Sequence, residues 1–266
     1  MIQDDRILEL LTTLSPLEPL KRHHDVKLPR AEYTGIWLLQ LESFSRWQDC
    51  NIMEDNSSVF CCYGIPGAGK TMICSVVIDY LYSQFHHHPT IGIACLYADY
   101  KDQNSQTLVH ILGSLLYQLL ITTTEPIPDE VIKKLQDIKQ YRGKLETKDC
   151  LALLEIRLLQ LQHAFICIDA VDELEPKVRR ELLNVFRELC TKNTRLFLTG
   201  RQHIESEVQK CFQVAQGYAV VISASKQDIE VFIRQQIIED PYMEDAMNEA
   251  LEKDIIAAIV EKSQGM

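Results

Sequence analysis

Residues 64–71 read Gly64-Ile65-Pro66-Gly67-Ala68-Gly69-Lys70-Thr71. This stretch matches the pattern G-x-x-x-x-G-K-[ST], in which glycines let the backbone curl until successive N–H groups point inward. An apolar segment precedes it at 59–63, and an amphipathic helical pattern follows it. A loop that leads from a buried strand into a helix N-terminus favours anions. The eight residues therefore predict a phosphate-binding loop, in which Lys70 contacts the β- and γ-phosphates of a nucleotide and the Thr71 hydroxyl ligates Mg²⁺.

Short apolar runs alternate with helical patterns on both sides of this loop. We expect five strands, at 58–63, 91–97, 164–168, 195–199 and 218–222. None of them alternates strictly between apolar and polar residues, which is typical of a parallel sheet covered on both faces. Apolar residues at spacings of three and four predict helices between the strands. The pattern predicts an α/β fold with three layers and a five-stranded parallel sheet.

The alternation is interrupted in three places, and these suggest a division of the chain. We expect a helical or linker segment at 1–50, a core at 51–224 and the start of a helical domain at 225–266. Within the core, a helical insertion occupies about 100–163 and is broken at 122–128 by the sequence TTTEPIP. The final helical region stops early, so we expect the chain to be a fragment or a truncated form of a longer protein.

A second chemical signal is an apolar run that ends in a carboxylate, followed by two more acids. The run Phe165-Ile166-Cys167-Ile168 leads into Asp169, and Asp172 and Glu173 come shortly after. In P-loop NTPases an acid at the end of a strand helps to hold Mg²⁺ together with the hydroxyl of the loop. The sequence therefore predicts Asp169 as the second metal-site residue. Asp172 and Glu173 are the candidates for orienting the attacking water, and the sequence does not decide between them.

A third, weaker signal follows the next expected strand, where Gly200 and Arg201 stand at its tip. A planar and permanently charged guanidinium suits the recognition of a γ-phosphate. The alternative is a solvated arginine at the edge of the sheet. On the helix that follows Glu175, we expect Lys177, Arg179 and Arg180 to form a solvent-exposed face, with contact to the nucleotide of a neighbouring subunit as the alternative.

The composition excludes several classes of protein. The 27 Lys and Arg residues stand against 38 Asp and Glu residues, for a net charge of −11, and nucleic-acid binders usually carry a basic patch. We therefore expect no nucleic-acid partner. No apolar run approaches the roughly 20 residues of a membrane span, and the acidic N-terminus does not resemble a secretory signal. Nine scattered cysteines without a CxxC pair favour a reduced, cytoplasmic protein over a disulfide or zinc framework.

Taken together, these motifs resemble a STAND-class P-loop ATPase of the NACHT type, and more narrowly the nephrocystin-3-like N-terminal domain of many fungal NOD-like-receptor-type proteins. The resemblance covers about residues 30 to 266. The matching stretches are 34–39 (TGIWLL), 62–71 continuing into 76–79 (VVID), 168–173 (IDAVDE), 198–201 (LTGR) and 263–266 (SQGM).

The resemblance implies a site, a topology and an activity. It implies ATP or ADP with Mg²⁺ as ligands, Asp169 at the metal, Asp172 with Glu173 as an extended acidic motif, and Arg201 as the sensor of the γ-phosphate. The segment near Thr34 and Gly35 would line the nucleoside. The strand order would be 5-1-4-3-2.

The activity implied is that of a switch in innate-immunity-like signalling, in which ADP holds a closed form and ATP permits self-association through the NTPase domain. We expect slow hydrolysis, that is, a weak ATPase. The alternatives are a nucleotide-binding scaffold that does not hydrolyse ATP and, less favoured, a P-loop kinase or nucleic-acid motor.

Overall fold

The structure is a computed structural model. It describes residues 5–49, 58–85, 88–123, 126–189, 193–223, 225–239 and 248–264. Some features of the sequence analysis fall outside these ranges. They are Cys50, Cys190, residues 124–125 of the expected break, and the last two residues of the SQGM stretch.

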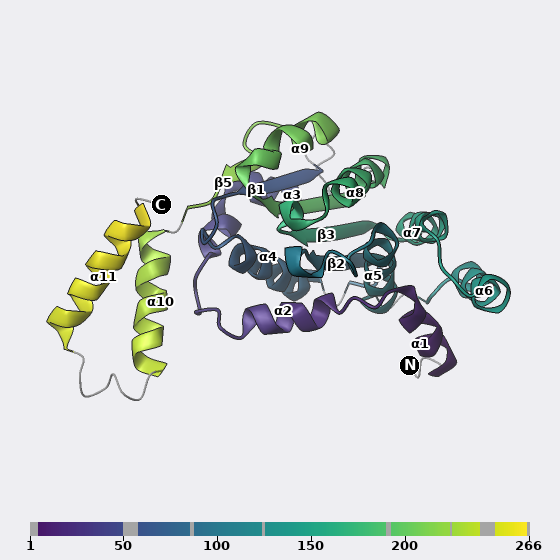
Figure 1. The fold of residues 1–266 in the computed structure, drawn as a ribbon, viewed down its shortest axis with the longest axis horizontal. Coiled ribbons are helices and arrows are strands. Elements are labelled where there is room, and N and C mark those ends of the chain that lie inside the picture. The colour runs from purple at the N-terminus through teal and green to yellow at the C-terminus, as the bar shows by residue number, and fades with distance from the viewer. Residues whose placement is uncertain are drawn as a thin grey trace.

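Five parallel strands form a single sheet in the order β2-β3-β4-β1-β5 (Figure 1). Their bounds are β1 Val59–Tyr63, β2 Ile91–Tyr97, β3 His163–Asp169, β4 Thr194–Gly200 and β5 Ala219–Val221. This confirms the predicted α/β fold, because the predicted order 5-1-4-3-2 is the same order read from the other edge. The carboxyl ends of all five strands meet at one edge of the sheet, where open α/β sheets bind their ligands.

The burial of each strand explains its apolar sequence. All residues of β1, β2 and β4 are buried, and in β3 only His163 is partly exposed. Strand β5 differs because it pairs only with β1 at the sheet's edge, and Val221 is largely exposed there. The strands thus behave as the interior of a three-layer fold, as the absence of polar alternation indicates.

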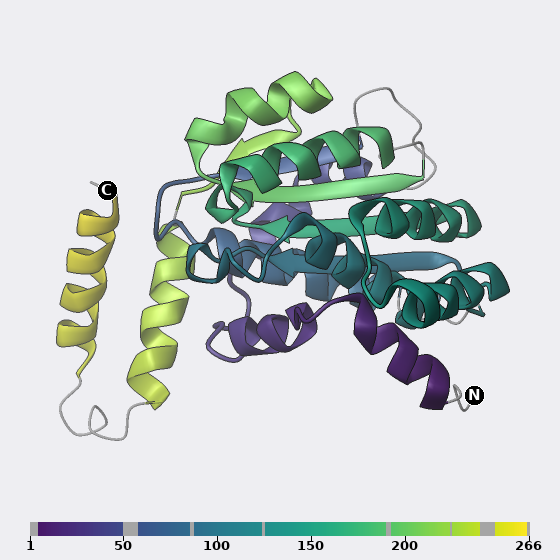
Figure 2. The ribbon, with the colours of Figure 1, turned by 45° about the vertical axis from the view of Figure 1, so that its right-hand side comes forward.

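Helices cover both faces of the sheet. Helix α4 (Lys70–Phe85) crosses one face in contact with β2, β3 and β4. Helices α5 (Leu108–Ile121), α7 (Thr147–Gln160) and α8 (Pro176–Leu189) lie on the opposite face, as right-handed crossovers require (Figures 1 and 2). Two shorter helices complete the core, α6 (Asp129–Asp137) and α9 (Glu205–Phe212).

The residues before β1 pack onto this core. They form helices α1 (Asp5–Leu11), α2 (Pro19–Lys27) and α3 (Glu42–Gln48). Trp47 is fully buried and makes ring contacts with Phe44, Phe60, Phe165 and Phe197. Because these rings belong to α3, β1, β3 and β4, the N-terminal segment shares the hydrophobic core of the sheet.

The last two helices stand beside the core. Helices α10 (Lys226–Glu239) and α11 (Glu249–Gln264) lie side by side at one end of the sheet, after β5 (Figures 1 and 2). A small apolar cluster of their own, built on Ile233, Ile256 and Val260, holds them together. No helix in the described part of the chain is both long enough and apolar enough to cross a membrane.

Candidate functional site

The loop between β1 and α4 is open on one side, and we call residues 64–71 the phosphate cup. Gly67 and Gly69 have φ values of +80° and +89°, which residues with a Cβ rarely adopt. A Cβ at either position would meet nothing within 4 Å, so this side of the loop faces open space. Gly64 is different, since a Cβ there would lie 2.9 Å from the carbonyl oxygen of Ile222. The loop thus combines left-handed turns with a close approach to the chain that follows β5.

Lys70, the first residue of α4, folds back over this loop. Its Nζ donates hydrogen bonds to the carbonyl oxygens of Gly64 at 2.9 Å and Ile65 at 2.8 Å. Partial burial lowers the pKa of Lys70, and the nearby carboxylates of Asp172 and Asp169 partly offset this effect. The two hydrogen bonds hold the ammonium group at the loop, where it can contact an anion.

Thr71 and Asp169 come together although they are distant in the sequence. Asp169 ends β3, and its buried carboxylate accepts a hydrogen bond from the hydroxyl of Thr199 and lies close enough to the hydroxyl of Thr71 for that group to lower its pKa. The Thr199 Oγ1–Asp169 Oδ1 distance is 2.6 Å, and Thr199 in turn accepts a bond from the N–H of Ala170. Burial raises the pKa of Asp169, and the two hydroxyls offset this only in part. A divalent cation beside Thr71 and Asp169 would balance the buried negative charge, so these residues fit an Mg²⁺ site.

The two acids after β3 meet Arg201, which follows β4. Both carboxylate oxygens of Asp172 are engaged, one by the N–H of Arg201 at 3.0 Å and the other by its Nε at 3.2 Å. Glu173 contacts Arg201 more loosely, with 3.9 Å between Oε1 and Nη2, and its Oε2 accepts a bond from the N–H of Tyr100. The Asp172 side chain is 3% exposed and the Glu173 side chain 25%. Of the two acids, only Glu173 is open to water.

Arg179 corrects one sequence-based expectation. Its side chain is mostly buried rather than on a solvent face. It pairs with Glu207 at 3.0 Å and donates to the carbonyl oxygens of Asp172 and Leu174. The sequence did contain a signal for this position. Arg179 precedes Leu182 and Leu183 by three and four residues, so it lies on the apolar face of its helix.

An apolar cavity of about 440 Å³ opens beside the loop. It is formed by the loop, by the segment before α3, and by the helices α10 and α11. Its lining includes Thr34, Gly35, Trp37, Gly67, Gly69, Met72, Asp228, Phe232 and Ile259. Asp228, which sequence reasoning missed, accepts a hydrogen bond from the N–H of Gly35 at 3.1 Å. The cavity thus joins the phosphate-binding loop to the C-terminal helix pair.

The fold and this site together define a class of protein. A glycine-rich loop leads from a parallel strand into a helix at the carboxyl edge of the sheet, with a lysine, a threonine and a buried acid beside it. This is a P-loop NTPase fold. The family model described as "Nephrocystin 3, N-terminal" matches residues 33–201. That match covers more than half of the chain, so the chain belongs to this family.

The chain is similar to several solved structures at low sequence identity. CDC6P from Pyrobaculum aerophilum superposes with a TM-score of 0.50 and 17% identity, over 85% of this chain and 52% of the other. The ORC1 protein of Aeropyrum pernix, in complex with DNA, gives a TM-score of 0.46 and 16% identity, over 69% and 46%. The ORC2 protein of the same organism, in ADPNP and ADP complexes, gives 0.45 and 14%, over 85% and 53%. The chain spans about half the length of these proteins. A comparison with curated proteins gives no match.

Proposed function

We propose that this chain is a STAND-class, NACHT-type ATPase module that binds ATP or ADP with Mg²⁺ and acts as a nucleotide-dependent conformational switch with slow hydrolysis. The observation that carries this proposal is that the loop and the apolar cavity share Gly67 and Gly69. With the phosphates of a nucleotide in the cup, its nucleoside would lie in the cavity. Thr34 and Gly35 would flank it on one side, and Asp228 and Phe232 on the other.

The cavity supports a switch because the C-terminal helices form part of its wall. A nucleoside there would contact both the core and helices α10 and α11, so its binding energy depends on how the two are placed. A ligand shifts a conformational equilibrium only by its differential affinity for the two states. Contacts to both the core and the two helices would provide such a difference. Self-association through the NTPase core, without nucleic acid and in the cytoplasm, completes the proposal.

The ion pairs of Arg201 support a role in sensing the γ-phosphate. Its guanidinium pairs with Asp172 and approaches Glu173. A γ-phosphate in the cup would compete for this cation. Release of Glu173 from Arg201 would then free its carboxylate to orient water. In this account the γ-phosphate, which distinguishes ATP from ADP, repositions the residues after β3 and β4.

Mg²⁺, when bound, would neutralise phosphate charge in the transition state of hydrolysis. In this chain Thr71 and Asp169 would hold it, with Thr199 fixing the carboxylate of Asp169. Lys70 would leave the carbonyls of Gly64 and Ile65 for the phosphate oxygens.

We predict that Glu173→Gln slows phosphate release by about 100-fold, the lower end of what a general base contributes. Glu173 is the acid that water can reach, whereas both oxygens of Asp172 are held by Arg201. Asp172→Asn therefore reduces the rate less. Phosphate release is measured at saturating Mg-ATP. Glu175→Gln is the control, since Glu175 is exposed and caps helix α8 through the N–H of Val178. If Glu173→Gln releases phosphate at the parent's rate, Glu173 is not the base, and if the parent itself releases no phosphate, the non-hydrolysing scaffold is the correct function.

Arg179→Met tests the support beneath these acids. Loss of its bonds to the carbonyls of Asp172 and Leu174 frees the loop that carries Glu173. We expect kcat for phosphate release to fall about tenfold, since hydrogen bonds from a charged group contribute roughly 1.5–3 kcal/mol, while KM for ATP changes little. Arg180→Met, one residue away and bonded to the carbonyl of Pro176, is the control. Equal effects of the two substitutions on kcat would contradict this role of Arg179.

A further inference from the structure

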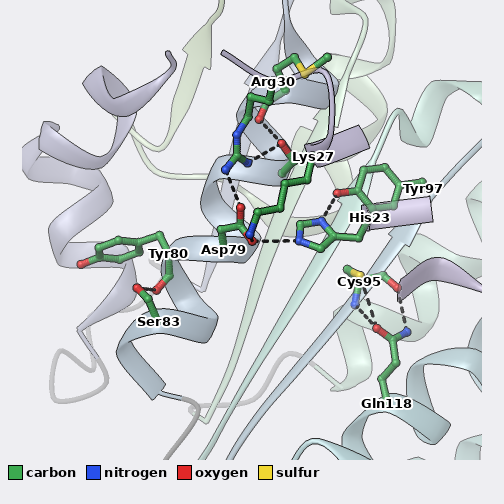
Figure 3. Close-up of polar contacts among 11 residues, drawn as sticks. His23, Lys27, Arg30, Asp79, Tyr80, Ser83, Cys95, Tyr97 and Gln118 are labelled. Atoms are coloured by element: carbon green, nitrogen blue, oxygen red, sulfur yellow. Dashed lines mark hydrogen bonds and ion pairs between the residues drawn. The ribbon is translucent and has the colours of Figure 1, made fainter. Parts of the chain in front are cut away.

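The segment before α3 forms one wall of the apolar cavity proposed to hold the nucleoside, and we call it the nucleoside wall. A cluster of charged side chains attaches this wall to α4, the phosphate-binding helix that begins with Lys70. Asp79, on α4, lies within hydrogen-bond distance of three basic side chains from α2 and the segment after it (Figure 3). His23 Nε2 and Lys27 Nζ approach its Oδ1 at 3.2 and 3.1 Å, and Arg30 Nη2 approaches its Oδ2 at 2.5 Å.

This cluster is partly shielded from water. The side chains of Asp79, His23 and Arg30 are 24%, 11% and 17% exposed, while Lys27 is 54% exposed. Burial alone would raise the pKa of Asp79, but the hydrogen bonds from His23, Arg30 and Lys27 lower it well below its usual range. Asp79 is therefore ionised at neutral pH, and the ion pair with Arg30 is less screened than a surface pair.

Arg30 differs from the other two basic residues because it makes a double contact and borders the cavity. Its Nη1 donates to Ser75 Oγ at 2.9 Å. Its Nη2 pairs with Asp79, as Figure 3 shows. Ser75 and Asp79 are one turn apart on the helix that begins with Lys70. Arg30 also lines the nucleoside cavity, and Lys27 does not. One guanidinium thus holds the start of the cavity wall against the helix that carries the phosphate site.

The wall that follows Arg30 has a shape that needs such support. Tyr33 and Gly35 both have left-handed backbone conformations, with φ of +67° and +75°. A non-glycine residue in this region is strained, and it persists only when its surroundings hold it. The hydroxyl of Thr34 donates to the carbonyl of Ala31, and the N–H of Gly35 donates to Asp228. The wall also packs on the core through the buried side chains of Ala31 and Leu38. The bridge made by Arg30 adds a polar link from this wall to helix α4.

We infer that Arg30, held by Asp79 and Ser75, is a positioning residue that fixes the nucleoside wall relative to the phosphate cup. It sets the affinity for the nucleoside part of a nucleotide and leaves the affinity for the phosphates nearly unchanged. This inference rests on the proposed nucleotide site. It implies that helix α2 and the phosphate-binding helix respond together when a nucleotide binds.

The test compares two ligands that share the phosphates and differ in the nucleoside. Dissociation constants for Mg-ATP and for inorganic tripolyphosphate with Mg²⁺ are measured by calorimetry on the full chain. Arg30→Met should lower the preference for ATP over tripolyphosphate by about tenfold, because a bridging charged hydrogen bond is lost. Asp79→Asn should lower the same ratio, although it changes the net charge in the opposite direction. A simple electrostatic effect on the phosphates would instead change the dissociation constants of the two variants in opposite directions. Within each variant it would change the constants for ATP and for tripolyphosphate by the same factor.

Lys27→Met is the matched control, since Lys27 pairs with the same carboxylate but does not border the cavity. It should change the ratio by less than about twofold, as expected for an exposed pair. Arg30→Lys keeps a cation near Asp79 but cannot bridge to Ser75, and it should give an intermediate ratio even if Arg30→Met folds poorly. An unchanged ratio in Arg30→Met or Arg30→Lys, or equal losses for both ligands, would overturn the inference. A parent chain that binds neither ligand would overturn the proposed nucleotide site itself.

Discussion

Lys70→Ala should abolish the thermal stabilisation of this chain by Mg-ATP. A ligand that binds only the native state stabilises it by about 2.7 kcal/mol at 100 times its Kd, which raises Tm by about 5–10 °C for a chain of this size. Lys70 supplies the positive charge of the phosphate cup, and its Nζ donates hydrogen bonds to the carbonyl oxygens of Gly64 and Ile65. Without it, the charge of the β- and γ-phosphates is not balanced. Melting curves with increasing Mg-ATP measure the effect, and the same titration with GTP compares the two bases.

Lys139→Ala is the control for this experiment. Lys139 pairs with Glu9 on the surface, so its loss removes the same charge without touching the loop. We expect Mg-ATP to raise the Tm of the parent and of Lys139→Ala by the same amount. The Tm of Lys70→Ala should be the same with and without nucleotide. A full shift in Lys70→Ala would mean that nucleotide binds elsewhere or that the lysine has no part in binding.

Asp169→Asn should have opposite effects on the free chain and on its complex. Above the folded-state pKa, which burial raises, the ionised carboxylate costs the fold free energy. This cost builds up as the pH rises from the unfolded-state pKa and is fully present only above the raised folded-state pKa. Asparagine removes the charge and can keep the bond from Thr199. The free variant should therefore melt at the parent's temperature or up to a few degrees higher, in line with a penalty of about 1–3 kcal/mol for an uncompensated buried polar group.

In the presence of ATP the same substitution should remove the contribution of Mg²⁺. Mg-ATP is expected to raise the Tm of the parent more than ATP with EDTA does. In Asp169→Asn the two increases in Tm should be equal. Asp102→Asn, at an exposed position, should behave as the parent does. A lower Tm of free Asp169→Asn, or an Mg²⁺ effect as large as in the parent, would contradict this account of Asp169.

The strands and the phosphate-binding loop could be predicted from the sequence because their signals are local. Each strand is an apolar run of suitable length, and the loop is a contiguous stretch of eight residues. The family resemblance then supplied the order of the strands. The ends of the strands were accurate to about one residue, since β3 and β4 begin one residue before the predicted ranges and extend one beyond them.

The parts of the site that the sequence did not reveal depend on contacts between distant segments. Asp228 meets Gly35 across nearly 200 residues, and Arg30 meets Asp79 across about 50. No spacing rule links such pairs, because the fold alone brings them together. The choice between Asp172 and Glu173 was open for the same reason. It depends on which carboxylate Arg201 occupies, and this requires the positions of both strand ends.

A metal ion shared by Thr71 and Asp169 can be located in crystals grown with Mn²⁺ and a non-hydrolysable ATP analogue. Anomalous scattering from manganese locates the ion without reference to the rest of the map. The account predicts one peak beside Thr71 and Asp169, within reach of both side chains directly or through one water, with Lys70 turned onto the phosphates. A nucleotide bound with its metal away from Asp169, or outside the cup of residues 64–71, would contradict it.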